Sequence, residues 1–179
     1  MLSIEKTALL LIDIQDRLTR VISDKESLVA NLQKLIKSVK VLGLPVLLTE
    51  QYPRGLGPTI PEVASLLPDI KSVVKMSFSC CGDGGFIREL KSLKREQVLV
   101  AGIETHVCVY QTVADLLNDG YEAQVVADCV SSRTRENKAI ALDRMKDIGA
   151  GITSVEMAVF ELLRTAESKQ FKDISQIIK

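Results

Sequence analysis

Three residues with complementary chemistry lie at or just beyond the ends of short apolar segments: Asp13, Lys75 and Cys108. A cysteine attacks a carbonyl carbon as its thiolate, and a neighbouring cation favours that thiolate. A carboxylate beside it can accept the thiol proton and return it to a leaving group. These residue types therefore predict nucleophilic catalysis by Cys108, provided that the fold brings the three side chains together.

Each of the three residues also has an ordinary structural interpretation. An aspartate at the end of a strand often caps a helix or turns the chain. A lysine is usually a solvated surface charge, and a cysteine in an apolar helix is more often part of the core than a nucleophile. Their positions in the fold must decide between the two interpretations.

Short apolar runs alternate with segments of helical periodicity along the chain. The first run, Thr7–Asp13, lacks period-two alternation and is typical of a strand buried on both faces. The alternation predicts one α/β domain over residues 1–179, a Rossmann-like three-layer α/β/α sandwich with a six-stranded parallel sheet. The expected strands are Thr7–Asp13, Val46–Thr49, Ser72–Lys75, Gln97–Gly102, Glu122–Ala127 and Ile152–Thr153. The expected helices are Asn31–Leu42, Phe86–Leu93, Thr105–Asn118, Asn137–Ile148, one capped by Thr153 that runs to about Arg164, and one from about Ile174.

Ligands of such a sheet bind beyond the carboxyl ends of its strands. Asp13 and Lys75 end two strands, and Cys108 lies in the first turn of the helix expected after a third. We therefore expect the three side chains to converge at one edge of the sheet. The helix N-terminus, the Lys75 charge and Asp13 as base are expected to lower the pKa of Cys108, and backbone N–H groups there to form an oxyanion hole.

The composition excludes several classes of protein. The chain has 23 Lys and Arg against 23 Asp and Glu, so a nucleic-acid partner and an anionic membrane surface are both disfavoured. The start of the chain lacks the pattern of a secretory signal, and no apolar run is long enough to span a bilayer. The four cysteines are not spaced as a disulfide framework. The expected location is therefore the cytoplasm, with reduced thiols.

The sequence resembles one known family over nearly its whole length, and three motifs carry the resemblance. LLLIDIQDRL, VVKMSFS and the long block VAGIETHVCVYQTVADLLNDGYEAQVVADCVSSR are similar to segments of isochorismatase-like cysteine hydrolases. The resemblance implies a triad of Asp13, Lys75 and Cys108, a cis peptide bond between Ile103 and Glu104, and an oxyanion hole from the N–H groups of Glu104 and Cys108. It also implies hydrolysis of C–N bonds in small amides through a thioester, and a homo-oligomer, a dimer or larger.

The chain departs from the nicotinamidases of that family at the segment after the second strand. These relatives bind a metal there through an aspartate and histidines, whereas this chain has Glu50, Gln51 and Tyr52. Its one histidine is His106, beside the expected nucleophile. No metal and no cofactor are therefore expected, and nicotinamide is disfavoured as the substrate. His106 is expected at the edge of the pocket or against a partner chain.

Five further residues are candidates for contacting substrate: Gln15, Tyr52, Arg54, Phe78 and Thr105. Gln15 is as readily explained by a helix start, and Phe78 by the core. Tyr52 and Arg54 lie in the Pro- and Gly-rich segment 50–68, a long loop of the kind that is often functional. Arg54 can bind a carboxylate in two hydrogen bonds, although a solvated loop charge is the favoured alternative.

Other polar residues have structural interpretations. Asp128, which ends the fifth strand, is expected to order its loop, with Arg133 and Arg135 bridging to it. Cys80 and Cys81 follow Lys75 closely, and inert buried thiols are the commoner case.

Two other classes of function remain open. A sheet that binds a nucleotide or flavin would carry a glycine-rich loop after the first strand, where this chain has Asp13-Ile-Gln-Asp16. A catalytically silent oligomeric scaffold would need none of the triad chemistry. An enzyme acting on nucleic acid is disfavoured by the balanced charge.

Overall fold

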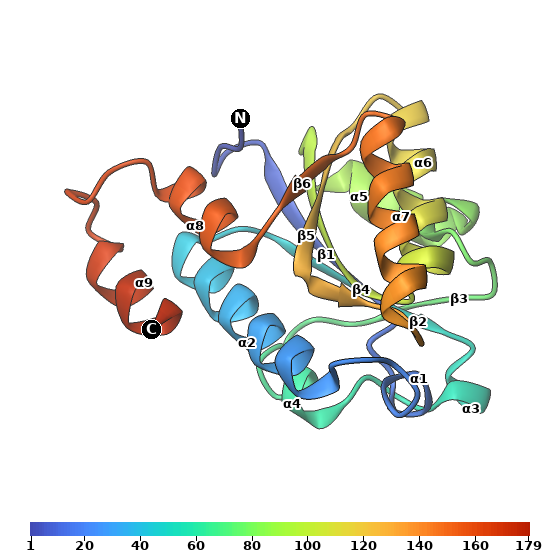
Figure 1. The fold of residues 1–179 in the computed structure, drawn as a ribbon. Coiled ribbons are helices and arrows are strands. Elements are labelled where there is room, and N and C mark those ends of the chain that lie inside the picture. The colour runs from blue at the N-terminus through green and yellow to red at the C-terminus, as the bar shows by residue number, and fades with distance from the viewer.

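Figure 1 shows a sheet held between two layers of helices in the computed structural model, which describes residues 1–179. All neighbouring strands are parallel. Across the sheet the order is β3 (Val73–Lys75), β2 (Val46–Gln51), β1 (Thr7–Ile12), β4 (Gln97–Ile103), β5 (Glu122–Ser131) and β6 (Gly151–Thr153). The predicted six-stranded parallel sheet is confirmed.

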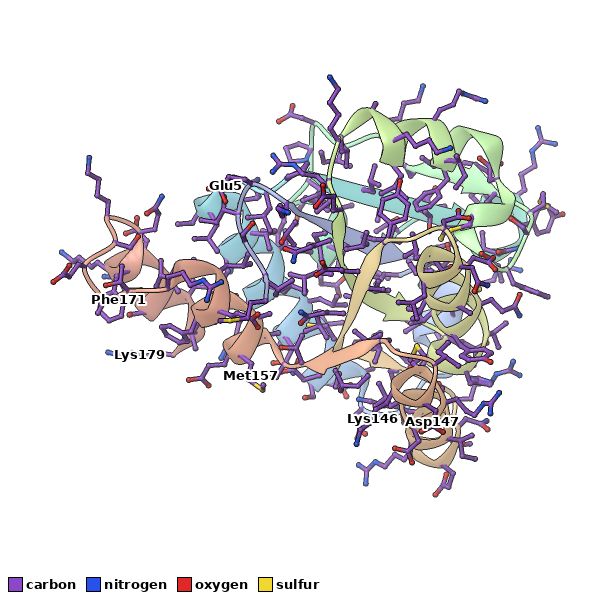
Figure 2. The ribbon with its side chains drawn as sticks, turned by 90° about the horizontal axis from the view of Figure 1, so that it is seen from above. Glu5, Lys146, Asp147, Met157, Phe171 and Lys179 are labelled. Carbon is purple, nitrogen blue, oxygen red and sulfur yellow. The ribbon has the colours of Figure 1, made fainter.

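Helices cover both faces of the sheet. One face carries α2 (Lys25–Leu42) and α8 (Val155–Leu163), and α9 (Phe171–Ile178) packs against these two helices rather than on the sheet. The other face carries α5 (Gly84–Ser92), α6 (Tyr110–Asn118) and α7 (Arg135–Asp147). Viewed from above in Figure 2, the labelled Met157 and Phe171 mark the first layer, and Lys146 and Asp147 mark the end of α7. The predicted three-layer sandwich is confirmed. No helix is both long and apolar enough to cross a membrane.

The alternating side chains of β1 supply both halves of the core. Leu9 and Leu11 belong to the cluster under α2 and α8, whereas Leu10 and Ile12 belong to the cluster under α5 and α6. Successive residues of a strand point to opposite faces, so a strand buried on both faces reads as a continuous apolar run. The residues of β1 are therefore continuously apolar because the strand is buried on both of its faces.

Several element boundaries differ from those expected. The segment after β2 holds the short helices α3 (Pro53–Leu56) and α4 (Pro61–Ala64), and α1 (Asp16–Thr19) follows β1. The start of α8 is capped by Ser154, whose hydroxyl accepts a hydrogen bond from the N–H of Met157 at 3.3 Å. The predicted cap at Thr153 is wrong because Thr153 still pairs with β5 as the last residue of β6.

The order of the strands reverses between β1 and β4, which lie side by side at the centre of the sheet. Such a reversal leaves a crevice beyond the carboxyl ends of the two strands. Gly102 (φ 132°) permits the close pairing there, since a Cβ atom at this position would lie 2.1 Å from the carbonyl oxygen of Ile12. The fold therefore brings the ends of β1 and β4 together at the place where ligands of such sheets bind.

Candidate active site

Asp13 and Lys75 form an ion pair that is closed off from solvent. The Lys75 Nζ lies 2.6 Å from Asp13 Oδ2, and neither side chain has exposed surface. Asp13 directly follows β1 with φ 52°, a left-handed conformation that aspartate tolerates better than most residues. Lys75 ends β3 and reaches across β2 to meet it. Two of the three predicted residues are therefore in direct contact.

The end of β2 supplies the remaining side chains that hold this pair. The hydroxyl of Thr49 donates a hydrogen bond to Asp13 Oδ1 at 2.8 Å, and Lys75 Nζ donates to Gln51 Oε1 at 2.8 Å. Lys75 also donates to the carbonyl oxygens of Phe78 at 3.0 Å and Ser77 at 3.2 Å. A buried ion pair is stable only when its remaining hydrogen-bond donors and acceptors also have partners.

Cys108 lies in a helical turn after β4, but not at the start of an ordinary α-helix. Residues Thr105–Val109 form a π-helical turn, and α6 begins at Tyr110. The Cys108 side chain is buried and belongs to the same cluster as Ile12 at the end of β1. The predicted continuous helix over Thr105–Asn118 is therefore wrong in its first turn, although it places Cys108 at the expected edge of the sheet.

The expectation of a lowered Cys108 pKa is wrong. Burial raises the pKa of the Cys108 thiol to about 12, and the charge of Asp13 and its hydrogen bond with the thiol also raise it. The Lys75 charge lowers it, but less than burial raises it. Cys108 is therefore a neutral thiol at rest, and attack requires that its proton be transferred as the reaction proceeds.

The peptide bond between Ile103 and Glu104 is cis, as the resemblance implies. The N–H of Glu104 forms no hydrogen bond with another backbone group. The Glu104 carboxylate is held by Arg133 in two hydrogen bonds, of 2.7 and 3.2 Å. One free donor therefore lies in the segment between β4 and Cys108.

The predicted bridges from Arg133 and Arg135 to Asp128 are wrong. Arg135 pairs with Asp24 instead, and Arg133 pairs with Glu104. Asp128 also lies within β5, which runs to Ser131, rather than at the end of the strand as expected. Asp128 does order its surroundings, since its carboxylate accepts a hydrogen bond from the N–H of Val155 at 2.9 Å.

The five substrate candidates fall into three groups. Tyr52, Arg54 and Phe78 are exposed side chains on the segments after β2 and β3. Thr105 is fully buried in the turn that carries Cys108, and its hydroxyl has no hydrogen-bond partner. The Gln15 amide is occupied by backbone groups of Gln51 and Gly57, so Gln15 fastens the end of β2 rather than offering a free polar group.

His106 lies in the turn Thr105–Val109, and its Nδ1 is 3.0 Å from the Ser132 hydroxyl. It lines a shallow cavity of about 160 Å³ with Tyr110, Ile140 and Arg144. All four cysteines are free thiols. No group of three or more His, Cys, Asp or Glu side chains is placed to hold a metal ion.

Thr49 and Gln51 contact the ion pair but were not predicted from the sequence. They occupy alternate positions at the end of β2, so both side chains lie on the same face of that strand. Two polar residues spaced by two after the apolar run Val46–Leu48 were the signal that could have identified them.

A second buried thiol gives a prediction about pH. Burial raises the pKa of Cys80 from 9.0 to about 11, although the Lys75 charge opposes this. The folded state keeps this proton where the unfolded chain loses it, so the stabilisation is fully present below pH 9.0 and is lost as the pH approaches 11. We expect the free energy of unfolding in urea to fall less over this range in Cys80→Ala than in the wild type, by on the order of 1–2 kcal/mol. An equal loss of the free energy of unfolding in the variant and the wild type would contradict this prediction.

Comparison with known proteins gives consistent matches over most of the chain. The isochorismatase domain model matches residues 7–157. A secreted isochorismatase effector of Phytophthora sojae is 43% identical over 154 residues, which cover 81% of this chain and 71% of that protein. Isochorismatase domain-containing protein 2A of Mus musculus is 38% identical over 176 residues, covering 98% and 84%. The structure of the MAR1 ribonuclease from Caenorhabditis elegans is 32% identical, with a TM-score of 0.93 and coverage of 99% and 91%.

Proposed function

The chain belongs to the isochorismatase domain family, and from this we propose that it hydrolyses a C–N bond of a small-molecule amide through a thioester on Cys108. The fold is that of isochorismatase-family hydrolases. The observation that carries the proposal is the buried pair of Asp13 and Lys75, whose charges both act on the Cys108 thiol. A buried charge pair beside a nucleophile, at the switch point of the sheet, is a costly arrangement that favours a catalytic role.

In the first half of the proposed reaction, Cys108 becomes bonded to the acyl group. The Asp13 carboxylate takes the thiol proton while the sulfur attacks the carbonyl carbon. The N–H groups of Glu104 and Cys108 bind the developing oxyanion. Asp13 then gives the proton to the leaving nitrogen, the C–N bond breaks, and an amine or ammonia departs. Lys75 keeps its positive charge throughout and holds the carboxylate in place.

In the second half, water releases the acyl group. Asp13 again acts as the base and takes a proton from water as the water oxygen attacks the thioester carbon. The carbon–sulfur bond breaks, the proton returns to sulfur, and the carboxylic acid leaves. No metal or cofactor takes part in either half, because the side chains supply the nucleophile, the base and the charge.

The substrate-contacting residues in this proposal are Tyr52, Arg54, Phe78 and Thr105, with Gln15 fixing the strand end behind them. Thr105 offers the buried hydroxyl without a partner, which suits a polar atom of the acyl group. Tyr52 and Phe78 are about half exposed, at 48% and 55%, and are proposed to line the mouth of the site. The substrate therefore presents a polar acyl end inward and an apolar part outward.

The proposed form of the enzyme is a homo-oligomer in the reducing cytoplasm. The edge strand β3 and the residues after it leave large apolar side chains on the surface, with Val74 52% and Met76 68% exposed. Such side chains in a row are commonly covered by a partner, and a second copy is the proposed partner. The four free thiols fit a reducing compartment.

The experiment that tests this function is a screen of the purified protein against small primary and secondary amides. Release of ammonia or amine is measured beside a parallel assay with single-stranded RNA, since one similar structure is named a ribonuclease. We expect turnover of at least one amide and no cleavage of RNA, because the chain has no excess of positive charge. Cleavage of RNA with no turnover of any amide would contradict the proposal.

A further inference from the structure

The hydroxyl group of Thr49 lies between two groups that flank the nucleophile. It donates a hydrogen bond to Asp13 Oδ1 at 2.8 Å, and it accepts one from the Cys80 thiol at 3.8 Å. All three side chains have no exposed surface. Thr49 therefore belongs to a series of hydrogen bonds that is shielded from solvent, and it is not a solvated residue at the end of a strand.

The direction of these hydrogen bonds follows from the number of protons that each group can donate. A threonine hydroxyl has one proton to donate. Because the neutral Cys80 thiol donates to the Thr49 oxygen, the Thr49 proton is left for the Asp13 carboxylate. The pKa of Cys80 is raised to about 11 by burial, so its proton stays in place over the ordinary pH range. The Asp13 carboxylate can only accept, so Thr49 donates to Asp13, and the Cys80 thiol donates the hydrogen bond that the Thr49 oxygen accepts.

A second threonine connects the same series of hydrogen bonds to Cys108. The hydroxyl of Thr112, in the first turn of α6, donates to the carbonyl oxygen of Cys108 at 2.6 Å. It also accepts a hydrogen bond from the N–H of Cys80 at 3.0 Å. The series Asp13, Thr49, Cys80, Thr112 and Cys108 is thus continuous, and it joins the end of β1 to the turn after β4.

We propose that Thr49 and Thr112 are positioning residues that hold the Asp13 carboxylate and the Cys108 turn in register for proton transfer. The inference rests on the proposed function. The charged and titratable groups facing Asp13 are Lys75, Cys80 and Cys108. Lys75 binds only Oδ2, and Thr49 holds Oδ1. Without Thr49, the carboxylate can turn so that both its oxygens face the ammonium group, which withdraws it from the thiol.

Each oxygen of the Asp13 carboxylate has its own donor, which explains why the site needs Thr49 in addition to Lys75. A short ion pair alone fixes one oxygen and leaves rotation about the Cβ–Cγ bond. Small errors in the placement of a reacting group slow a reaction greatly, since effective concentration depends on orientation. Thr49 therefore acts through Asp13, and Thr112 acts through the backbone of Cys108.

The test measures alkylation of Cys108 by iodoacetamide at about pH 7, with peptide mass spectrometry resolving each cysteine. We expect Thr49→Val to slow alkylation of Cys108 about tenfold or more, and Thr49→Ser, which keeps the hydroxyl, to stay within about twofold of the wild type. Thr153→Val makes the same change at the end of β6, where the hydroxyl donates only to the Ser154 carbonyl oxygen, and is expected to leave the rate unchanged. Alkylation of the half-buried Cys81 provides the internal reference.

Two further variants keep the outcomes separate. Thr112→Val is expected to slow the alkylation of Cys108 as well, and it decides the matter if Thr49→Val does not fold. Wild-type alkylation rates in the folded valine variants, while Asp13→Asn loses amide hydrolysis, would overturn the positioning role and leave the proposed function standing. An unchanged rate of amide hydrolysis in Asp13→Asn would instead remove Asp13 as the base and with it the proposed function.

Discussion

Replacing Cys108 with alanine is expected to lower the rate of amide hydrolysis by on the order of 10⁴-fold or more. In the proposed mechanism the Cys108 sulfur bonds to the acyl group, and no other thiol is placed to do so. Cys80 and Cys129 are fully buried, and Cys81 lies outside the contacts of Asp13 and Lys75. The variant is expected to fold, because removal of one buried sulfur leaves the Asp13–Lys75 ion pair intact.

The matched control for this prediction is Cys81→Ala. Cys81 is half-buried in the 3₁₀ turn Cys80–Gly82 that follows β3, so its loss tests for general effects of removing a thiol. Turnover is measured with any amide found by screening, and the control is expected to remain within about threefold of the wild type. Full activity in Cys108→Ala would show that a different group attacks the substrate.

Replacing Lys75 with methionine is expected to destabilise the fold by about 3–5 kcal/mol. Methionine matches the length of the lysine stem, so packing changes little, but the Asp13 carboxylate is left as a buried charge without its partner. Lys75 also satisfies Gln51 and two carbonyl groups, at 2.8–3.2 Å, and these acceptors lose their donor. Unfolding in urea, followed by circular dichroism, measures the loss.

A second substitution separates the lost charge from the lost packing. Asn is the suitable replacement for Asp13, because asparagine tolerates the left-handed conformation found there. The double variant Lys75→Met with Asp13→Asn carries no charge at either position of the buried pair, and we expect it to recover at least half of the lost stability. Equal instability of the single and double variants would mean that the ion pair is not the source of the loss.

The positions of the triad follow from features that the sequence displays directly. Asp13 and Lys75 end apolar runs, and the carboxyl ends of parallel strands lie at the same edge of the sheet. Cys108 follows the run that forms β4, the immediate neighbour of β1. Burial on both faces gives β1 and β4 a continuous apolar pattern, which explains why the central strands and the layers were predictable.

The groups around the triad depend on contacts between distant segments, which no local pattern contains. Thr49 and Gln51 contact the ion pair only because β2 lies between β1 and β3 in the sheet. Arg133 meets Glu104 rather than Asp128 because the chain turns after β5. The raised pKa of Cys108 follows from the depth of its burial, and a helix start inferred from sequence does not reveal that depth.

The most direct test of the proposed role of Cys108 is the intact mass of the protein during turnover of an amide substrate. Rapid acid quenching preserves a thioester, and peptide mapping locates it. We predict a mass increase equal to the acyl group minus one hydrogen, carried by Cys108 in the wild type and absent from Cys108→Ala. Turnover of the amide with no adduct on any cysteine, or with an adduct on Cys80 or Cys81, would contradict it.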